Sequence, residues 1–217
     1  MSGVVACSIA DGQTLEPQTV ETVTVAFRVL FTALVAIIVP IYLRSYGPAN
    51  FLWFSDIGLF GIAVALWLES AFLGSMMALC VLLPETLWLV SVTTGVLTGG
   101  RAATTLASYM FDPRVPLYLR ALSCAFHLAL VPGALWLVYR YGYDGRALGA
   151  QWLLALIVLP ATFWLAPREK NINWVRGFGH PPRSPFRPAV HLALMMLAYP
   201  ALVYLPAHWL LLRLAGV

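Results

Sequence analysis

The sequence predicts an all-α fold, a polytopic membrane helix bundle with about six transmembrane helices. Of the 217 residues, 61% are hydrophobic and only 10% are charged, and the mean hydropathy is +0.83. Soluble domains contain about 25% charged residues. The apolar residues also fall into six segments, each near the roughly 20 residues that cross a bilayer. A soluble core cannot bury this much apolar surface, so we expect the lipid bilayer to surround the chain.

The chain begins with a polar, acidic stretch, 1–21, which we expect to be a mostly irregular N-terminal tail. The remainder, 22–217, is expected to form one six-helix transmembrane domain. Its apolar segments are 22–43, 50–68, 72–96, 116–139, 148–165 and 188–212. Residues 69–71 alone separate the second segment from the third, which predicts a tight antiparallel hairpin, and Pro84 predicts a kink in the third. The stretch 100–115 is too short and polar to span, so we expect an interfacial element or a loop there.

The distribution of basic residues predicts the topology. Six spans place the first, third and fifth loops on one face, and that face carries Arg44, Arg101, Arg114, Arg168, Lys170, Arg176, Arg183 and Arg187. The opposite face carries Arg140, Arg146 and Arg213 together with the acidic tail. Because Lys and Arg concentrate in cytoplasmic loops, we expect a protein of the bacterial inner membrane with both termini outside the cytoplasm. Without a basic stripe on a soluble face, the charge does not indicate nucleic-acid binding.

The fifth loop, 167–187, reads PREKNINWVRGFGHPPRSPFR and holds five of the thirteen Lys and Arg residues. Orientation in the membrane explains these basic residues. It does not explain Asn171, Asn173 or Trp174, whose grouping suggests a specific hydrogen-bonded conformation. We expect this cytoplasmic loop to act as a lid, with Asn171 and Asn173 turned inward.

Ionisable groups inside membrane spans are costly and usually face the bundle interior or a hydrated cavity. Arg120, Ser123, Cys124 and His127 recur at helical spacing in the fourth segment, so they share one stripe,. Asp56 in the second segment lies at a depth similar to that of Arg120. We expect these two to pair, either as a structural salt bridge or as part of a functional cavity.

Glu85 follows Pro84 near the middle of the third segment, and His127 lies at comparable depth in the fourth. A Glu85–His127 pair would carry protons, bind a cation or form a single interhelical hydrogen bond. The residues expected to bind a substrate are Asn50, Asp56, Glu85, Arg120, His127, Asn171 and Asn173. The dispersed histidines and cysteines form no HxxxH, HExxH or CxxC pair, so no metal site is expected.

Three stretches resemble a family of small bacterial multi-pass membrane-associated proteins: 46–60, 65–88 and 167–179, the last with an EKNINW-type loop motif. The resemblance extends from the second segment to the C-terminus. It implies a shared fold and a shared polar site at Asn50, Trp53, Asp56, Glu69, Glu85, Glu169, Asn171 and Asn173, but it implies no reaction. The family pattern has an acidic residue ahead of this motif, where the present chain has Ala166 and Arg168.

Three functions fit these patterns. The first is binding or transport of a small substrate or ion by a cytoplasm-facing polar cluster. The second is an integral-membrane enzyme acting on a lipid or amphiphile. The third is a structural or accessory subunit of a larger membrane complex. Besides the lipid bilayer, the expected partner is a second copy of the chain or such a complex.

Overall fold

The computed structural model describes residues 16–179 and 181–216. Within these ranges the protein is a bundle of helices and contains no β-strand. The helices are α1 (Pro17–Tyr46), η1 (Pro48–Leu52), α2 (Phe54–Leu68), α3 (Ala71–Leu97), η2 (Ser108–Phe111), α4 (Leu117–Tyr141), α5 (Ala147–Leu165), η3 (Arg168–Lys170), η4 (Ile172–Trp174), α6 (Pro188–Ala198), η5 (Tyr199–Tyr204) and α7 (Leu205–Ala215). The all-α bundle predicted from hydropathy is therefore confirmed.

Five helices of the described chain are long and apolar enough to cross a membrane, where α6, η5 and α7 count as one continuous helix. The protein is therefore compatible in length and composition with a multi-pass membrane protein. Helix α2 has 15 residues, about 22 Å at 1.5 Å per residue, so it is shorter than the expected span. Helix α1 begins at Pro17, so 17–21 are helical where an irregular tail was expected, and 1–15 lie outside the described residues.

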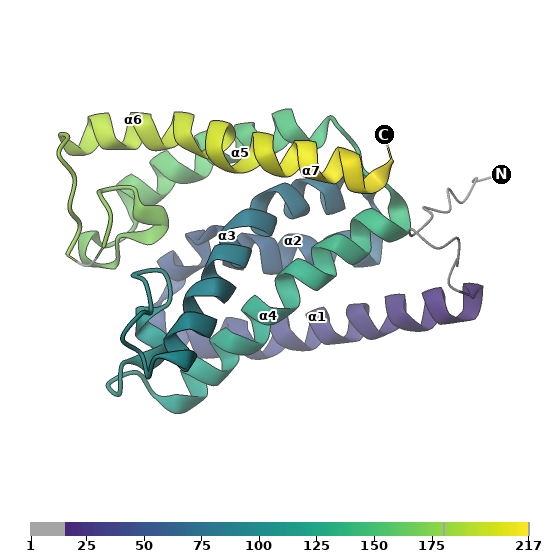
Figure 1. Ribbon diagram of the computed structural model, residues 1–217, viewed down its shortest axis with the longest axis horizontal. Helices are drawn as coiled ribbons and strands as arrows, with labels where there is room; N and C mark the ends of the chain where they lie inside the picture. Colours follow the sequence, from purple (N-terminus) through teal and green to yellow (C-terminus); the bar gives the residue numbers. More distant parts are fainter. Residues whose placement is uncertain (1–15, 180, 217) are drawn as a thin grey trace.

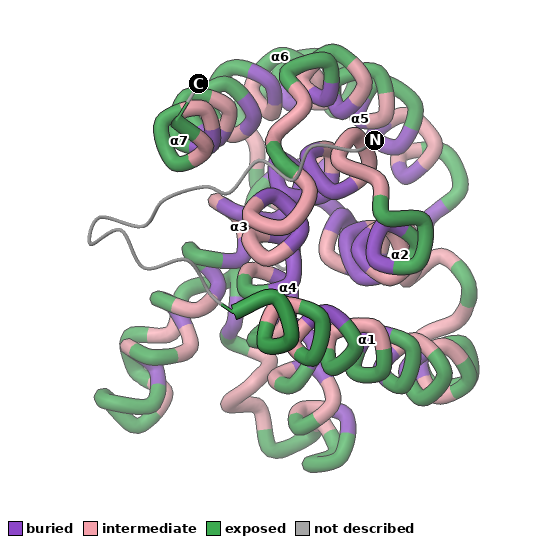
Figure 2. The backbone as a smooth tube through the Cα atoms, turned by 90° about the vertical axis from the view of Figure 1, so that its right-hand side faces the viewer, coloured by how far each residue is buried: buried purple, intermediate pink, exposed green. Residues whose placement is uncertain are grey.

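Helix α3 is the central element of the bundle (Figure 2) and contacts α2, α4, α5 and α7. Small residues allow the close helix contacts, as is usual where lipid removes the hydrophobic drive for helix association. A Cβ atom on Gly58 would lie 2.3 Å from Cγ1 of Val81, and one on Gly133 would lie 2.5 Å from the ring of Phe31. These glycines therefore set how closely α2 approaches α3 and how closely α4 approaches α1.

The loops divide between two ends of the bundle (Figure 1). The segments 47–53, 98–116, 166–179 and 181–187 gather at one end, here called the loop end, while the start of α1 and the end of α7 lie at the other. The residues predicted to share one basic face lie in or beside these segments. The structure therefore brings the predicted first, third and fifth loops together.

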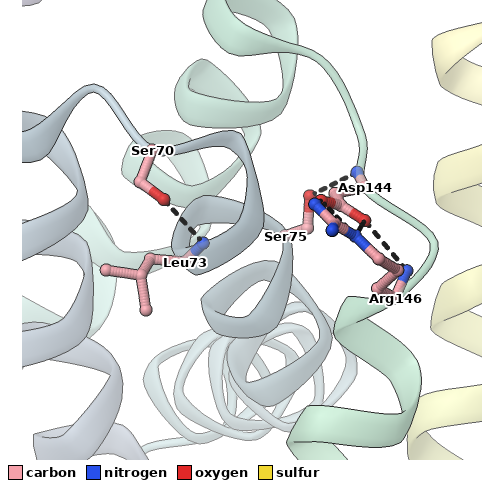
Figure 3. Close-up of polar contacts among 5 residues, drawn as sticks. All are labelled: Ser70, Leu73, Ser75, Asp144 and Arg146. Atoms are coloured by element: carbon pink, nitrogen blue, oxygen red, sulfur yellow. Dashed lines mark hydrogen bonds and ion pairs between the residues drawn. The ribbon is translucent and has the colours of Figure 1, made fainter.

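At the opposite end, polar contacts fix the start of α3 and the turn between α4 and α5 (Figure 3). The Ser70 hydroxyl caps α3 by accepting from the Leu73 amide at 3.2 Å. The Ser75 hydroxyl accepts from the Asp144 amide at 2.9 Å, and Asp144 pairs with Arg146 at 2.6 Å. Because Ser75 lies on α3, this bond ties the α4–α5 turn to the central helix.

The last of the five long apolar helices is interrupted by a π-helical turn, η5, between α6 and α7. Pro200 lies at the start of this turn and has no amide hydrogen, so the regular α-helical bonding cannot continue through it. The turn places Tyr199 against Phe54 of α2, with ring centroids 5.0 Å apart. Tyr199 also lines the cavity described next.

Candidate functional site

A cavity of about 360 Å³ lies between the helices near the loop end. Helices α1 to α4 and the π-helical turn all contribute side chains to its wall, together with residues of the loop-end segments. Five of the seven residues expected to bind a substrate line it, namely Asn50, Asp56, Glu85, His127 and Asn173. Sequence positions up to 123 residues apart, from Asn50 to Asn173, therefore converge on one space.

A buried polar contact in this cavity joins α3 and α4. Nδ1 of His127 lies 2.5 Å from Oε2 of Glu85, and both side chains are buried. The ring of His127 also stacks on Trp88, with centroids 4.3 Å apart and planes inclined by 17°. The predicted Glu85–His127 pair is confirmed. Within the described chain, Nε2 of His127 has no hydrogen-bond partner, so that nitrogen is free to act on a bound molecule.

Asp56 lies in the first turn of α2 and is only 1% exposed. Its Oδ2 accepts one hydrogen bond, from Nδ2 of Asn50 at 3.2 Å. Its Oδ1 is buried and has no hydrogen-bond partner among the described residues. An isolated buried carboxylate is strongly unfavourable, so Asp56 must be protonated or must meet a counter-ion supplied from outside the described chain.

The expected pairing of Asp56 with Arg120 is wrong. Nη1 of Arg120 donates instead to the main-chain oxygen of Met110, at 3.2 Å, and Arg120 is not among the residues that line the cavity. The segment 98–116 lies beside α4, and Met110 of this segment supplies the acceptor instead. Arg120 therefore stabilises the loop end of the bundle rather than the cavity.

The loop 167–187 contributes its two asparagines in different ways. Oδ1 of Asn173 caps α2 by accepting from the Phe54 amide at 3.1 Å, and its Nδ2 donates to the Leu52 oxygen at 2.7 Å. Asn171 stays within its own loop, where Nδ2 donates to the Gly177 oxygen at 2.7 Å. Both side chains are buried, as expected. Asn173 lines the cavity, whereas Asn171 shapes the loop and does not.

Asn171 and Asn173 have backbone φ angles of 41° and 51°. Positive φ is uncommon outside glycine and is best tolerated by Asn and Asp. Trp174 shares this conformation, with φ of 57°, and its ring meets Trp53 of the first loop at 6.1 Å between centroids. The two asparagines therefore turn the chain so that the fifth loop closes against the first.

Nine of the nineteen residues that line the cavity are Phe, Tyr or Trp. They are Tyr42, Tyr46, Trp53, Phe54, Trp88, Tyr109, Phe126, Trp174 and Tyr199. Of these nine residues, the sequence patterns singled out only Trp53 and Trp174. One signal was available, because Trp88 follows Glu85 at the i+3 spacing that puts two side chains on one helix face.

One polar chain runs along this wall. Nε1 of Trp88 donates to the Tyr109 hydroxyl at 3.2 Å, and that hydroxyl lies 2.6 Å from Oγ of Ser123. Burial raises the pKa of the Tyr109 phenol above its usual range, so Tyr109 remains a neutral donor. These hydrogen bonds link η2 to α3 and α4 and fix the loop side of the cavity.

Two acidic residues of the site implied by family resemblance lie elsewhere. Glu69 pairs with Arg28 at 2.5 Å and is 58% exposed in its side chain, and Glu169 is exposed in the loop. Neither lines the cavity. Among the residues that the structure describes, no Lys or Arg lines the cavity, and no three His, Cys, Asp or Glu side chains cluster as a metal site. The cavity is thus acidic and aromatic.

Comparison with protein-family models, curated proteins and solved structures found no match to this chain. The geometry of the cavity is therefore the basis for assigning a function.

Proposed function

We propose that this chain is a bacterial inner-membrane protein that binds a small molecule in the loop-end cavity and moves it into or across the bilayer. The observation that carries the proposal is Asp56, a buried carboxylate in the cavity wall with one hydrogen-bond partner, Asn50, and an unpartnered Oδ1. Polar groups at membrane depth are costly and are retained mainly where they meet a substrate, an ion or water. A bound molecule would supply the missing partner.

The cavity has the composition of a ligand site. Its volume of about 360 Å³ lies within the roughly 300–1,000 Å³ of small-molecule pockets, which combine apolar walls with a few placed polar groups. The Glu85–His127 pair places an imidazole in the cavity wall, and its Nε2 can form a hydrogen bond with such a ligand. The basic residues of the loop end favour a cytoplasmic opening.

A second candidate is an enzyme, and the Glu85–His127 contact favours it specifically. A carboxylate bonded to Nδ1 orients a histidine so that Nε2 can act as a general base. Ser123 and Tyr109 lie in the same cavity, but they bond to each other. The enzyme therefore needs a water or a substrate hydroxyl at Nε2. Conversion of a bound ligand by the wild type, and its loss with retained binding in His127→Gln, would select the enzyme over the transporter.

The accessory-subunit function requires that the polar residues be satisfied within the bundle. Asp56 departs from this requirement, since the described chain leaves its Oδ1 without a partner. We therefore rank it below ligand binding.

Accessibility of the cavity tests the proposal. In a cysteine-free background, Ser123→Cys places a thiol in the cavity wall, and Leu79→Cys places one in the sealed core of α3. A membrane-impermeant thiol reagent should label position 123 from the loop-end face of the membrane and leave position 79 unlabelled from either face. Equal protection of both positions would overturn the proposal. Labelling of position 123 from the opposite face alone would contradict the proposed opening.

A further inference from the structure

The cavity also indicates the chemical class of its ligand, and this inference rests on the proposed function. We infer that the ligand is an organic cation, an amine or ammonium group on a compact apolar or aromatic body, with Asp56 as its counter-ion. This inference deepens the proposed function. It rests on the charge of the wall, the position of Arg120 and the aromatic lining.

The wall contains acids and no compensating cation. Asp56 and Glu85 both line the cavity, and within the described ranges no Lys or Arg does. Glu85 has a partner in His127, which leaves Asp56 as the unmatched acid. Arg120, which was expected to pair with Asp56, donates instead to the Met110 carbonyl. Lys170, a cation of the loop 167–187, donates to the main-chain oxygen of Tyr46.

An anionic ligand would add charge beside two carboxyl groups and find no Lys or Arg in the wall. A neutral ligand could hydrogen-bond to a protonated Asp56, but it would leave the charge of an ionised Asp56 unmatched. A metal ion would need several oxygen, nitrogen or sulfur ligands, and no group of three such His, Cys, Asp or Glu side chains forms among the described residues. An organic cation satisfies Asp56 with a single ion pair and needs no further ligands.

The rest of the wall suits the body of such a cation. Tyr42 and Tyr46 lie one helical turn apart on α1, with ring centroids 5.1 Å apart, and both line the cavity. Trp88 and Tyr109 line it as well. Aromatic faces attract ammonium groups through the ring quadrupole, and they also accept apolar or aromatic rings. Carboxylate and aromatic wall together match an arylalkyl amine.

Three probes of nearly equal size separate charge from shape: 2-phenylethylamine, its neutral analogue 2-phenylethanol, and the anion 3-phenylpropanoate. Binding to the full chain in lipid nanodiscs is measured by calorimetry. We expect the amine to bind at least about tenfold more tightly than the alcohol, and the anion to bind most weakly. Asp56→Asn should lower the amine affinity to that of the alcohol without changing the affinity of the alcohol.

Asp112→Asn is the matched control, because Asp112 is also a loop-end aspartate but pairs with Arg114 outside the cavity. It should leave all three affinities unchanged. Tyr46→Leu should reduce the ratio of amine to alcohol affinity, and it keeps the test decisive if Asp56→Asn fails to fold.

Equal binding of amine and alcohol, or an unchanged amine affinity in a folded Asp56→Asn variant, would overturn the cation inference and leave cavity binding intact. Absence of binding by all three probes, with Ser123→Cys still labelled, would also overturn it. Absence of binding with Ser123→Cys protected would instead refute the proposed function itself.

Discussion

Removal of both members of the Glu85–His127 pair should lower the free energy of unfolding by less than the sum of the losses caused by the two single removals. The two atoms lie 2.5 Å apart, and the side chains are only 6% and 10% exposed. Loss of one member of such a buried pair costs about 3–5 kcal/mol, because the other is left unpaired. The double variant loses packing but strands no polar group, so the coupling between the sites should be about 1.5–3 kcal/mol.

The assay is a double-mutant cycle of Glu85→Ala, His127→Ala and the combined variant. Free energies of unfolding are measured by circular dichroism in mixed micelles titrated with a denaturing detergent. The Arg28–Glu69 pair gives a control cycle, since Glu69 is 58% exposed and exposed pairs contribute about 0–1 kcal/mol. Additive effects at Glu85 and His127, within about 0.5 kcal/mol, would refute the view that this contact joins α3 to α4.

Further predictions concern the cap, the helix contacts and the loop. Asn173→Ala should lower the free energy of unfolding by about 2–3 kcal/mol, because it removes a helix cap and strands buried backbone groups. Asn173→Asp keeps the acceptor for the Phe54 amide but turns a second acceptor oxygen toward the Leu52 oxygen, so it should also destabilise the protein in the same detergent titration,. Gly133→Ala should lower thermal stability, at a cost of about 1–3 kcal/mol, whereas Gly149→Ala, with nothing within 4 Å, should be neutral or stabilising by about 0.5–1 kcal/mol. Arg114 lowers the pKa of Asp112 to about 2. This ion pair should therefore be complete above about pH 4 and lost as the pH falls through 2, which carbon NMR of the carboxyl can follow, and Arg114→Ala should raise that pKa.

The helices were predictable because the bilayer imposes both their length and their composition. The third segment, expected at 72–96, is α3 at Ala71–Leu97, and the fifth, expected at 148–165, is α5 at Ala147–Leu165. Helix α2 was harder to delimit. Residues 48–52 form the separate η1 turn, and the cap that starts α2 comes from Asn173, far along the chain.

Depth along a helix predicted part of the site. It brought Glu85 and His127 together, because two mid-span polar groups have few other partners in a bilayer. It failed for Asp56 and Arg120. Near a membrane surface a long arginine side chain can reach loop carbonyls as well as a carboxylate, and hydropathy does not reveal the path of 98–116. The aromatic wall was missed because Trp and Tyr are also common at membrane interfaces.

Hydroxyl-radical footprinting of the unmodified protein in nanodiscs tests the central claim most directly, because it oxidises side chains that contact water. Tyr42 lines the cavity and is 4% exposed, while Tyr204 is 0% exposed and lies outside the cavity wall. A hydrated ligand cavity predicts oxidation of Tyr42, protection of Tyr204, and slower oxidation of Tyr42 when 2-phenylethylamine is bound. Equal protection of the two tyrosines without ligand would mean that the cavity is sealed and would contradict a function in small-molecule binding.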